Sequence, residues 1–178
     1  MKLRILRGVA ALALAGLAAL PLSAAASGIA VADLDDMQTV GEARMRVLFW
    51  DVYDARLLAP QGTYREDHPF ALSLTYLRRL DGEKIAERSI EEMRSQGLTD
   101  DSTLDRWLAF LTEVIPDVGV ADEIIGLAAA DGSTRFFRDG VLIGEIDDAR
   151  FTRAFFDIWL GDRTSEPGLR DQLLGLRR

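Results

Sequence analysis

Arginine and tyrosine side chains give this sequence its clearest chemistry, which is anion binding. Arg44 and Arg46 lie two residues apart, and Tyr53 follows them closely along the chain. A guanidinium group binds a carboxylate or phenolate through two parallel hydrogen bonds, and a tyrosine hydroxyl adds a further donor. Tyr76 and Arg88 are candidates of the same kind. A pocket that combines these groups with Phe, Trp and Leu side chains would suit an amphiphile with one anionic end.

Each of these candidates also has a purely structural interpretation. Arg44 and Arg46 share one face of a strand because side chains alternate, and that face can simply be solvated. Tyr53 and Tyr76 fit half-buried positions of a sheet. Arg88 is flanked by acidic residues that suit ion pairs on a helix surface. The sequence leaves both interpretations open for all five residues.

Several other chemistries lack the residues that they need. The chain contains no Cys, which excludes a thiol nucleophile, a thiolate zinc site and a redox motif. Its only histidine, His68, precedes a proline, and we expect it in a loop without a catalytic role. The acidic clusters at 33–36 and 100–101 suit helix caps or solvated loops better than metal ligands. No Walker A loop or dinucleotide fingerprint is present, so we predict neither a metal nor a cofactor.

The elements that position the candidates follow from hydrophobic periodicity. Val40–Ala59 predicts two strands or one long bent strand, and Phe70–Leu77 predicts another. Asp81 is predicted to cap a helix that ends near Ser95. A second helix is predicted for Ser102–Val114, where apolar residues recur at helical spacing.

The second half of the chain repeats this order. Ile124–Ile146 predicts a three-stranded meander, with Asp-Gly turns at 131–132 and 139–140. Asp147 or Asp148 is predicted to cap a third helix that ends at Gly161. Ser165 is predicted to start a final helix whose apolar positions are Leu169, Leu173 and Leu176.

Strands, two helices, strands and two helices in this order indicate an α+β fold. We expect an antiparallel β-sheet covered on one face by helices. The tryptophans are predicted to be core residues, namely Trp50, Trp107 and Trp159.

The first 26 residues have the composition of a cleaved secretory signal peptide. Three basic residues precede an apolar run from Gly8 to Leu20, and small residues lead to a predicted cleavage after Ala26. The apolar run is short for a membrane span, which takes about 20 residues. We expect a periplasmic protein without a stable membrane anchor, with residues 27–37 as a lead-in and residues 38–178 as the domain.

The chain is strongly acidic. Its formal net charge is −8, from 21 basic and 29 acidic residues. Removing the leader takes away three basic residues and no acidic ones, which leaves 18 against 29, or −11. Phosphate backbones and anionic lipid head groups would repel such a chain as a whole, so we expect no nucleic-acid partner.

Several segments resemble those of the chalcone isomerase-like family, in its exported bacterial branch. The resemblance covers residues 38–176, and its most specific pieces are Val40–Ala43, Trp50–Ala55, Phe70–Tyr76, Ile85–Ser89 and Ile158–Pro167. It implies an open-faced β-sandwich in which ligands lie between a large antiparallel sheet and a layer of helices.

The resemblance also implies which positions would carry chemistry. Plant chalcone isomerases use an Arg, a Thr, a Tyr and an Asn. Arg44 stands where their Arg is expected, with Arg46 as a competitor, whereas Leu48, Asp81 and Arg88 occupy the other three places. Related plant fatty-acid-binding members hold a carboxylate with an Arg and a Tyr, a pair that Arg44 or Arg46 could form with Tyr53.

Three hypotheses of function follow. The first is a periplasmic protein that binds a small amphiphilic or fatty-acid-like ligand without chalcone cyclisation. The second is an isomerase or intramolecular lyase acting on another substrate, which would need a positioned cation to stabilise an enolate or phenolate. The third is a partner-binding protein of the cell envelope. The oligomeric state does not follow from the sequence.

Overall fold

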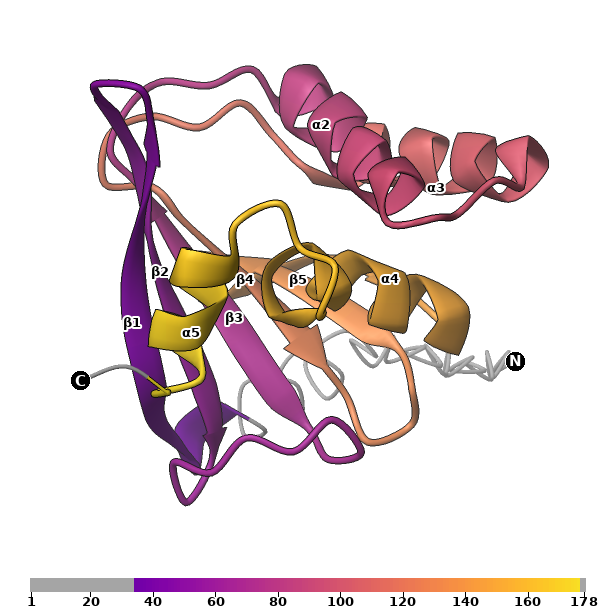
Figure 1. The fold of residues 1–178 in the computed structure, drawn as a ribbon. Coiled ribbons are helices and arrows are strands. Elements are labelled where there is room, and N and C mark those ends of the chain that lie inside the picture. The colour runs from indigo at the N-terminus through magenta and orange to yellow at the C-terminus, as the bar shows by residue number, and fades with distance from the viewer. Residues whose placement is uncertain (1–33, 177–178) are drawn as a thin grey trace, which may run out of the picture.

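A single antiparallel sheet carries the fold of the computed structural model, which describes residues 34–176. Its strands follow one another in the order β1-β2-β3-β4-β5-β6, as a continuous meander (Figure 1). They are β1 Met37–Val47, β2 Trp50–Pro60, β3 Phe70–Tyr76, β4 Glu123–Ala128, β5 Thr134–Arg138 and β6 Val141–Ile146. The predicted α+β class with an antiparallel sheet is confirmed.

Helices cover one face of this sheet. They are α2 Gly82–Ser95, α3 Asp101–Val114, α4 Ala149–Leu160 and α5 Pro167–Leu173. In the view of Figure 1, α4 and α5 lie in front of the sheet, and α2 and α3 form a pair above them. The final helix begins at Pro167 rather than Ser165, and Leu176 lies beyond its end with 65% of its surface exposed.

Aspartate side chains cap the N-termini of three helices. A carboxylate suits this position because it accepts hydrogen bonds from backbone N–H groups that lack a helical partner. Asp81 accepts from the Lys84 amide at α2, as predicted. Asp148, and not Asp147, caps α4 and also accepts a 3.0 Å hydrogen bond from the Trp107 indole of α3. This one carboxylate therefore ties α3 to the start of α4.

Aromatic side chains dominate the core between sheet and helices. Trp107, Phe136 and Phe151 are at most 1% exposed, and their rings meet edge to face. Trp159 is also buried, so the core prediction holds for Trp107 and Trp159. It is wrong for Trp50, which is 62% exposed because it stands at the turn between β1 and β2.

Candidate functional site

A cavity of about 690 Å³ lies between the sheet and the helices. The sheet contributes alternate residues of β3, since side chains two apart on a strand share a face: Leu72, Leu74 and Tyr76 line the cavity. The helices contribute Ser89 from α2 and Phe155 from α4, among others. Most of the lining is apolar, and the volume is within the roughly 300–1,000 Å³ usual for small-molecule sites.

Gly126 on β4 keeps part of this space open. It lies opposite Leu72 in the β3–β4 register and lines the cavity. A Cβ atom there would lie 3.4 Å from the Phe156 ring of α4, so even an alanine side chain would fill the space between the strand and the helix.

Two tyrosines bring hydroxyl groups to this apolar space. Tyr53 and Tyr76 are cross-strand partners on β2 and β3, and their rings meet edge to face with centroids 6.1 Å apart. The Tyr53 oxygen accepts a 2.9 Å hydrogen bond from the Trp159 indole. That bond uses the oxygen as acceptor, so the Tyr53 O–H remains able to donate to a ligand.

The Tyr76 hydroxyl has no hydrogen-bond partner among residues 34–176, although the residue is only 3% exposed. Its oxygen is not sealed inside protein, because no sealed side-chain oxygen or nitrogen in this part of the chain lacks a partner. The hydroxyl therefore faces the cavity. Buried polar groups are normally hydrogen-bonded, so this group favours an occupant with an acceptor atom.

Burial keeps both hydroxyls protonated. It raises the pKa of Tyr53 to about 12, against a smaller opposite effect of the Trp159 hydrogen bond. It also raises the pKa of Tyr76, with a further contribution from Tyr53. The pair thus consists of neutral donors at any physiological pH.

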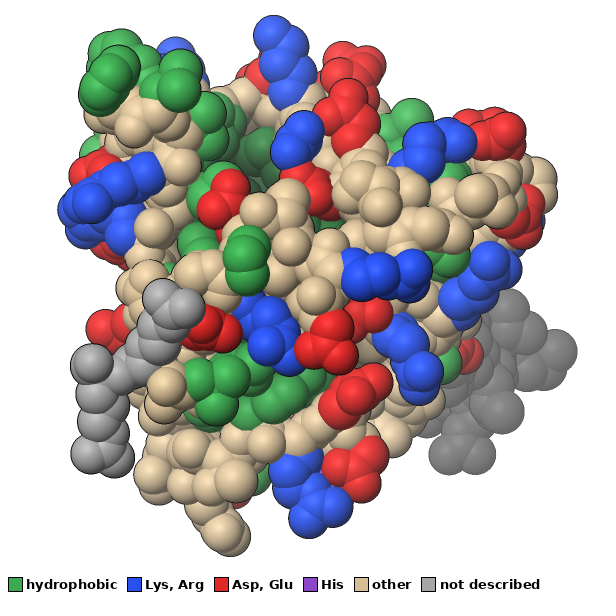
Figure 2. Space-filling model, in the orientation of Figure 1, with side chains coloured by type: hydrophobic (Ala, Val, Ile, Leu, Met, Phe, Trp, Pro, Cys, Tyr) green, Lys and Arg blue, Asp and Glu red, His purple; other side chains and the backbone are tan. Residues whose placement is uncertain are grey.

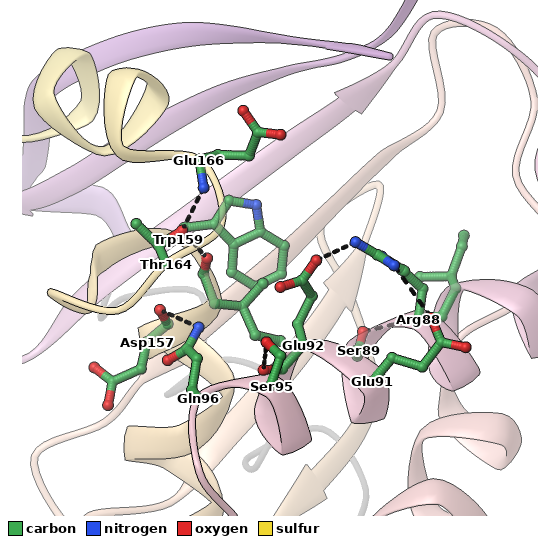
Figure 3. A network of polar contacts seen from close by, with 12 residues as sticks. Arg88, Ser89, Glu91, Glu92, Ser95, Gln96, Asp157, Trp159, Thr164 and Glu166 are labelled. Atoms are coloured by element: carbon green, nitrogen blue, oxygen red, sulfur yellow. Dashed lines mark hydrogen bonds and ion pairs between the residues drawn. The ribbon is translucent and has the colours of Figure 1, made fainter. Parts of the chain in front are cut away.

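Basic residues lie at the rim of the cavity rather than in its interior. Arg46 pairs with Asp51, with 2.6 Å between Nε and the carboxylate. Arg88 pairs with Glu91 and Glu92 (Figure 3). Lys84 has no acidic partner among the described residues, which makes it the one rim cation of this part of the chain left to face an anion. It is also the only lysine that follows the leader.

Beside the cavity, an ion pair lies within α2, and a hydrogen bond one turn further on joins α2 to α4. Glu92 is buried, lines the cavity and receives the Arg88 guanidinium. One turn on, the Gln96 side-chain amide donates a 3.0 Å hydrogen bond to the Asp157 carbonyl of α4 (Figure 3). The Gln96–Asp157 bond joins the two helices that carry Ser89 and Trp159, and so helps to set the width of the space between them.

Arg44 lies apart from this site. It extends from the opposite face of the sheet, where it pairs with Asp54 at 2.6 Å and with Asp51 at 3.2 Å. Both acids raise its pKa, Asp54 more strongly. Arg44 and Arg46 both reach Asp51, but the β1–β2 pairing shifts register between Met45 and Arg46, and Arg46 lines the cavity whereas Arg44 does not. The cavity itself is lined by the other four predicted residues and not by Arg44.

Sequence reasoning missed several polar groups of the cavity, among them Lys84, Glu92 and the indole of Trp159. A signal for the first two was present. Lys84, Arg88 and Glu92 recur every four residues, and such residues share one side of a helix. The Trp159 indole had no such signal, because its partner Tyr53 lies 106 residues away in sequence.

Comparison with known proteins identifies the family and agrees with the fold. The sequence profile of a family described as chalcone isomerase-like matches residues 36–175. An uncharacterised protein of Haemophilus influenzae is 32% identical over 139 residues, which cover 78% of this chain and 68% of that protein. The crystal structure of a fatty-acid binding protein of Arabidopsis thaliana shares the fold with a TM-score of 0.61, at 13% identity, over 79% of this chain and 87% of that one. The chain belongs to the chalcone isomerase-like family.

Proposed function

We propose that this member of the chalcone isomerase-like family binds a small amphiphile with an acidic end, such as a fatty acid, in the cavity between sheet and helices. The observation that carries the proposal is the buried Tyr76 hydroxyl, which faces an apolar cavity and has no partner among residues 34–176. An oxygen of the ligand would accept its hydrogen bond.

The cavity lining has an apolar part for the hydrocarbon body of such a ligand and a polar part for its acidic end. Leu72, Leu74 and Phe155 offer an apolar surface for a hydrocarbon body. Tyr53 and Tyr76 offer two hydroxyl donors for a carboxylate, and Lys84 adds a positive charge at the rim. The Arabidopsis protein that shares the fold is named for fatty-acid binding, which supports this ligand class.

The positions of the remaining residues favour binding over ring closure. Arg46, at the cavity rim, is already paired with Asp51. Arg44 is the other arginine that could supply the cation that stabilises a developing enolate or phenolate. Its guanidinium is instead held by Asp54 and Asp51 on the face away from the cavity. Leu48 stands in an exposed turn and Asp81 caps α2, so neither supplies a donor to a bound ring.

We further propose that the protein acts in the periplasm after removal of residues 1–26. The support is the composition of the leader, which lies outside the described residues. A domain without cysteine needs no disulfide there, because its aromatic core is already continuous.

Oleate titration of a matched pair of variants tests the proposal. Tyr76→Phe removes the cavity hydroxyl and breaks no hydrogen bond within residues 34–176. Tyr64→Phe is the control, because Tyr64 packs against Phe70 and does not line the cavity. Loss of one hydrogen bond to a charged group costs about 1.5–3 kcal/mol, so Tyr76→Phe should weaken oleate binding roughly tenfold or more while Tyr64→Phe leaves it unchanged.

A second variant tests the contribution of the rim charge. Lys84→Gln should weaken binding of oleate but not of its uncharged methyl ester, because only the carboxylate gains from the ammonium group. Equal affinity of wild type and Tyr76→Phe for oleate would contradict the proposed pose. Absence of any saturable oleate binding by the wild-type protein would contradict the function itself.

A further inference from the structure

The turn between β1 and β2 exposes a continuous run of large apolar side chains. This segment, Val47–Trp50, is called the hairpin tip below. Its side chains are 50%, 86%, 96% and 62% exposed in chain order. Figure 2 shows them as a protruding hydrophobic group at the upper left of the molecule. A soluble surface rarely presents such a run without a binding partner.

The backbone of the hairpin tip holds these side chains outward. Leu48 has a φ of +55°, a left-handed conformation that Gly or Asn adopts more easily than a branched apolar residue. Leucine nevertheless occupies this position of the turn, where it is 86% exposed.

Basic groups surround the hairpin tip. The Arg78 guanidinium lies 5.1 Å from the centre of the Trp50 ring. Arg46 and Arg78 line one surface groove together with Phe49 and Trp50. Arg78 and its exposed neighbour Arg79 have no acidic partner among residues 34–176.

Acidic groups near the hairpin tip are already engaged. Asp51 and Asp54 together receive Arg44 and Arg46, so that cluster has no charge in excess. Asp81 caps the first turn of α2. The remaining acidic surface of the chain acts over distance, and its field is screened within about 10 Å at moderate salt. The positive charge beside the tip is therefore that of Arg78, which has no acidic partner among residues 34–176.

The hairpin tip also adjoins the cavity. Val47 and Leu48 belong both to the tip and to the cavity rim, next to Lys84 of α2. In Figure 2 a recess with hydrophobic side chains lies beside the protruding group. A surface that held the tip would lie against the opening of the cavity.

We propose that the hairpin tip docks the protein on an anionic phospholipid bilayer. Leu48 and Phe49 insert among the lipids at head-group depth, and Arg78 and Arg79 contact the phosphates. Insertion is shallow, since no helix among residues 34–176 is long and apolar enough to cross a membrane. This inference goes beyond ligand binding, because it requires nothing to occupy the cavity.

Co-sedimentation with vesicles tests the docking surface. The mature protein is mixed with vesicles of equal parts phosphatidylglycerol and phosphatidylcholine, and separately with phosphatidylcholine alone. The double variant Leu48→Asn with Phe49→Ser removes two exposed side chains and relaxes the turn. Burying a large apolar side chain contributes about 1.5–3 kcal/mol, so the double variant should lower the partition coefficient roughly tenfold or more.

Matched controls separate the tip from general surface effects. Val141→Ser changes another exposed apolar residue, 65% exposed on β6 at the far edge of the sheet, and should leave partitioning unchanged. Arg79→Gln should weaken binding to the anionic vesicles more than to the neutral ones. Arg153→Gln on α4, away from the tip in Figure 1, should not.

Two outcomes would overturn the docking proposal. One is wild-type protein that does not sediment with anionic vesicles, or does so equally in the double variant. The other is a dimer in analytical ultracentrifugation that the double variant abolishes, which would assign the tip to a second copy of the chain. Vesicles without oleate are used throughout, so failure here leaves the oleate result unaffected.

Discussion

At the scale of single residues, the proposed ligand binding depends on which polar side chains of the sheet point toward the cavity. Tyr53 and Tyr76 could be named from the sequence because tyrosines flanked by strand residues are few. Their convergence could not, because it depends on the β2–β3 register. The sequence predicted that Arg44 and Arg46 share a face, but it shows neither the register shift between Met45 and Arg46 nor which face of the sheet the helices cover.

Tyrosine ionisation gives a prediction about pH. Below pH 10, the ordinary value, both the folded and the unfolded chain keep Tyr53 protonated. From pH 10 to about 12 the unfolded chain ionises while the folded one does not, so the free energy of unfolding should fall as pH rises. Urea denaturation across this window, with phenolate absorbance as a second signal, measures the fall.

The same experiment has an internal comparison. Tyr76→Phe removes one group with a raised pKa and should make the decline in stability shallower. An unfolding free energy that is constant up to pH 12 would show that the tyrosines are not buried as described.

At the scale of elements, the sequence predicted well where local chemistry decides. The Asp-Gly turns place β4, β5 and β6, and Gly132 and Gly140 both have positive φ there. The turn of the β1–β2 hairpin has no Gly, Pro, Asn or Asp at its centre, so the sequence allowed one long bent strand as well as two. The exposure of Trp50 follows from that turn and was missed with it.

Helix α2 offers a way to close the cavity without disturbing the core. Ser89 lines the cavity, and its hydroxyl bonds only to the Ile85 carbonyl of its own helix. Ser89→Leu should therefore fill space in the cavity and weaken oleate binding roughly tenfold or more, as expected when a bulky group occupies a ligand's place.

Ser95→Leu is the matched control on the same helix. The Ser95 hydroxyl bonds to the Glu92 carbonyl in the same manner, but Ser95 is exposed and lies outside the cavity. Both variants should keep the helical signal in circular dichroism. Unchanged oleate affinity in Ser89→Leu would mean that the ligand binds elsewhere.

At the scale of the whole molecule, the fold class was the most predictable property. Alternating runs of strand and helix patterns determine two layers, whatever the details of packing. The net charge is a global quantity, and it says nothing of Arg78 beside the hairpin tip, which has no acidic partner among residues 34–176. Local charge depends on which acids are already paired, as Asp51 is, and pairing is visible only in three dimensions.

Native mass spectrometry of the protein recovered from a periplasmic extract tests the central claim most directly. We expect the mass of a chain that begins after Ala26, increased by the mass of a bound molecule. Solvent extraction should identify that molecule as an acidic amphiphile. We expect loss of that adduct in Ser89→Leu and retention in Ser95→Leu. A protein that carries no adduct and takes up none from added oleate would contradict the account, as would an adduct that both variants retain equally.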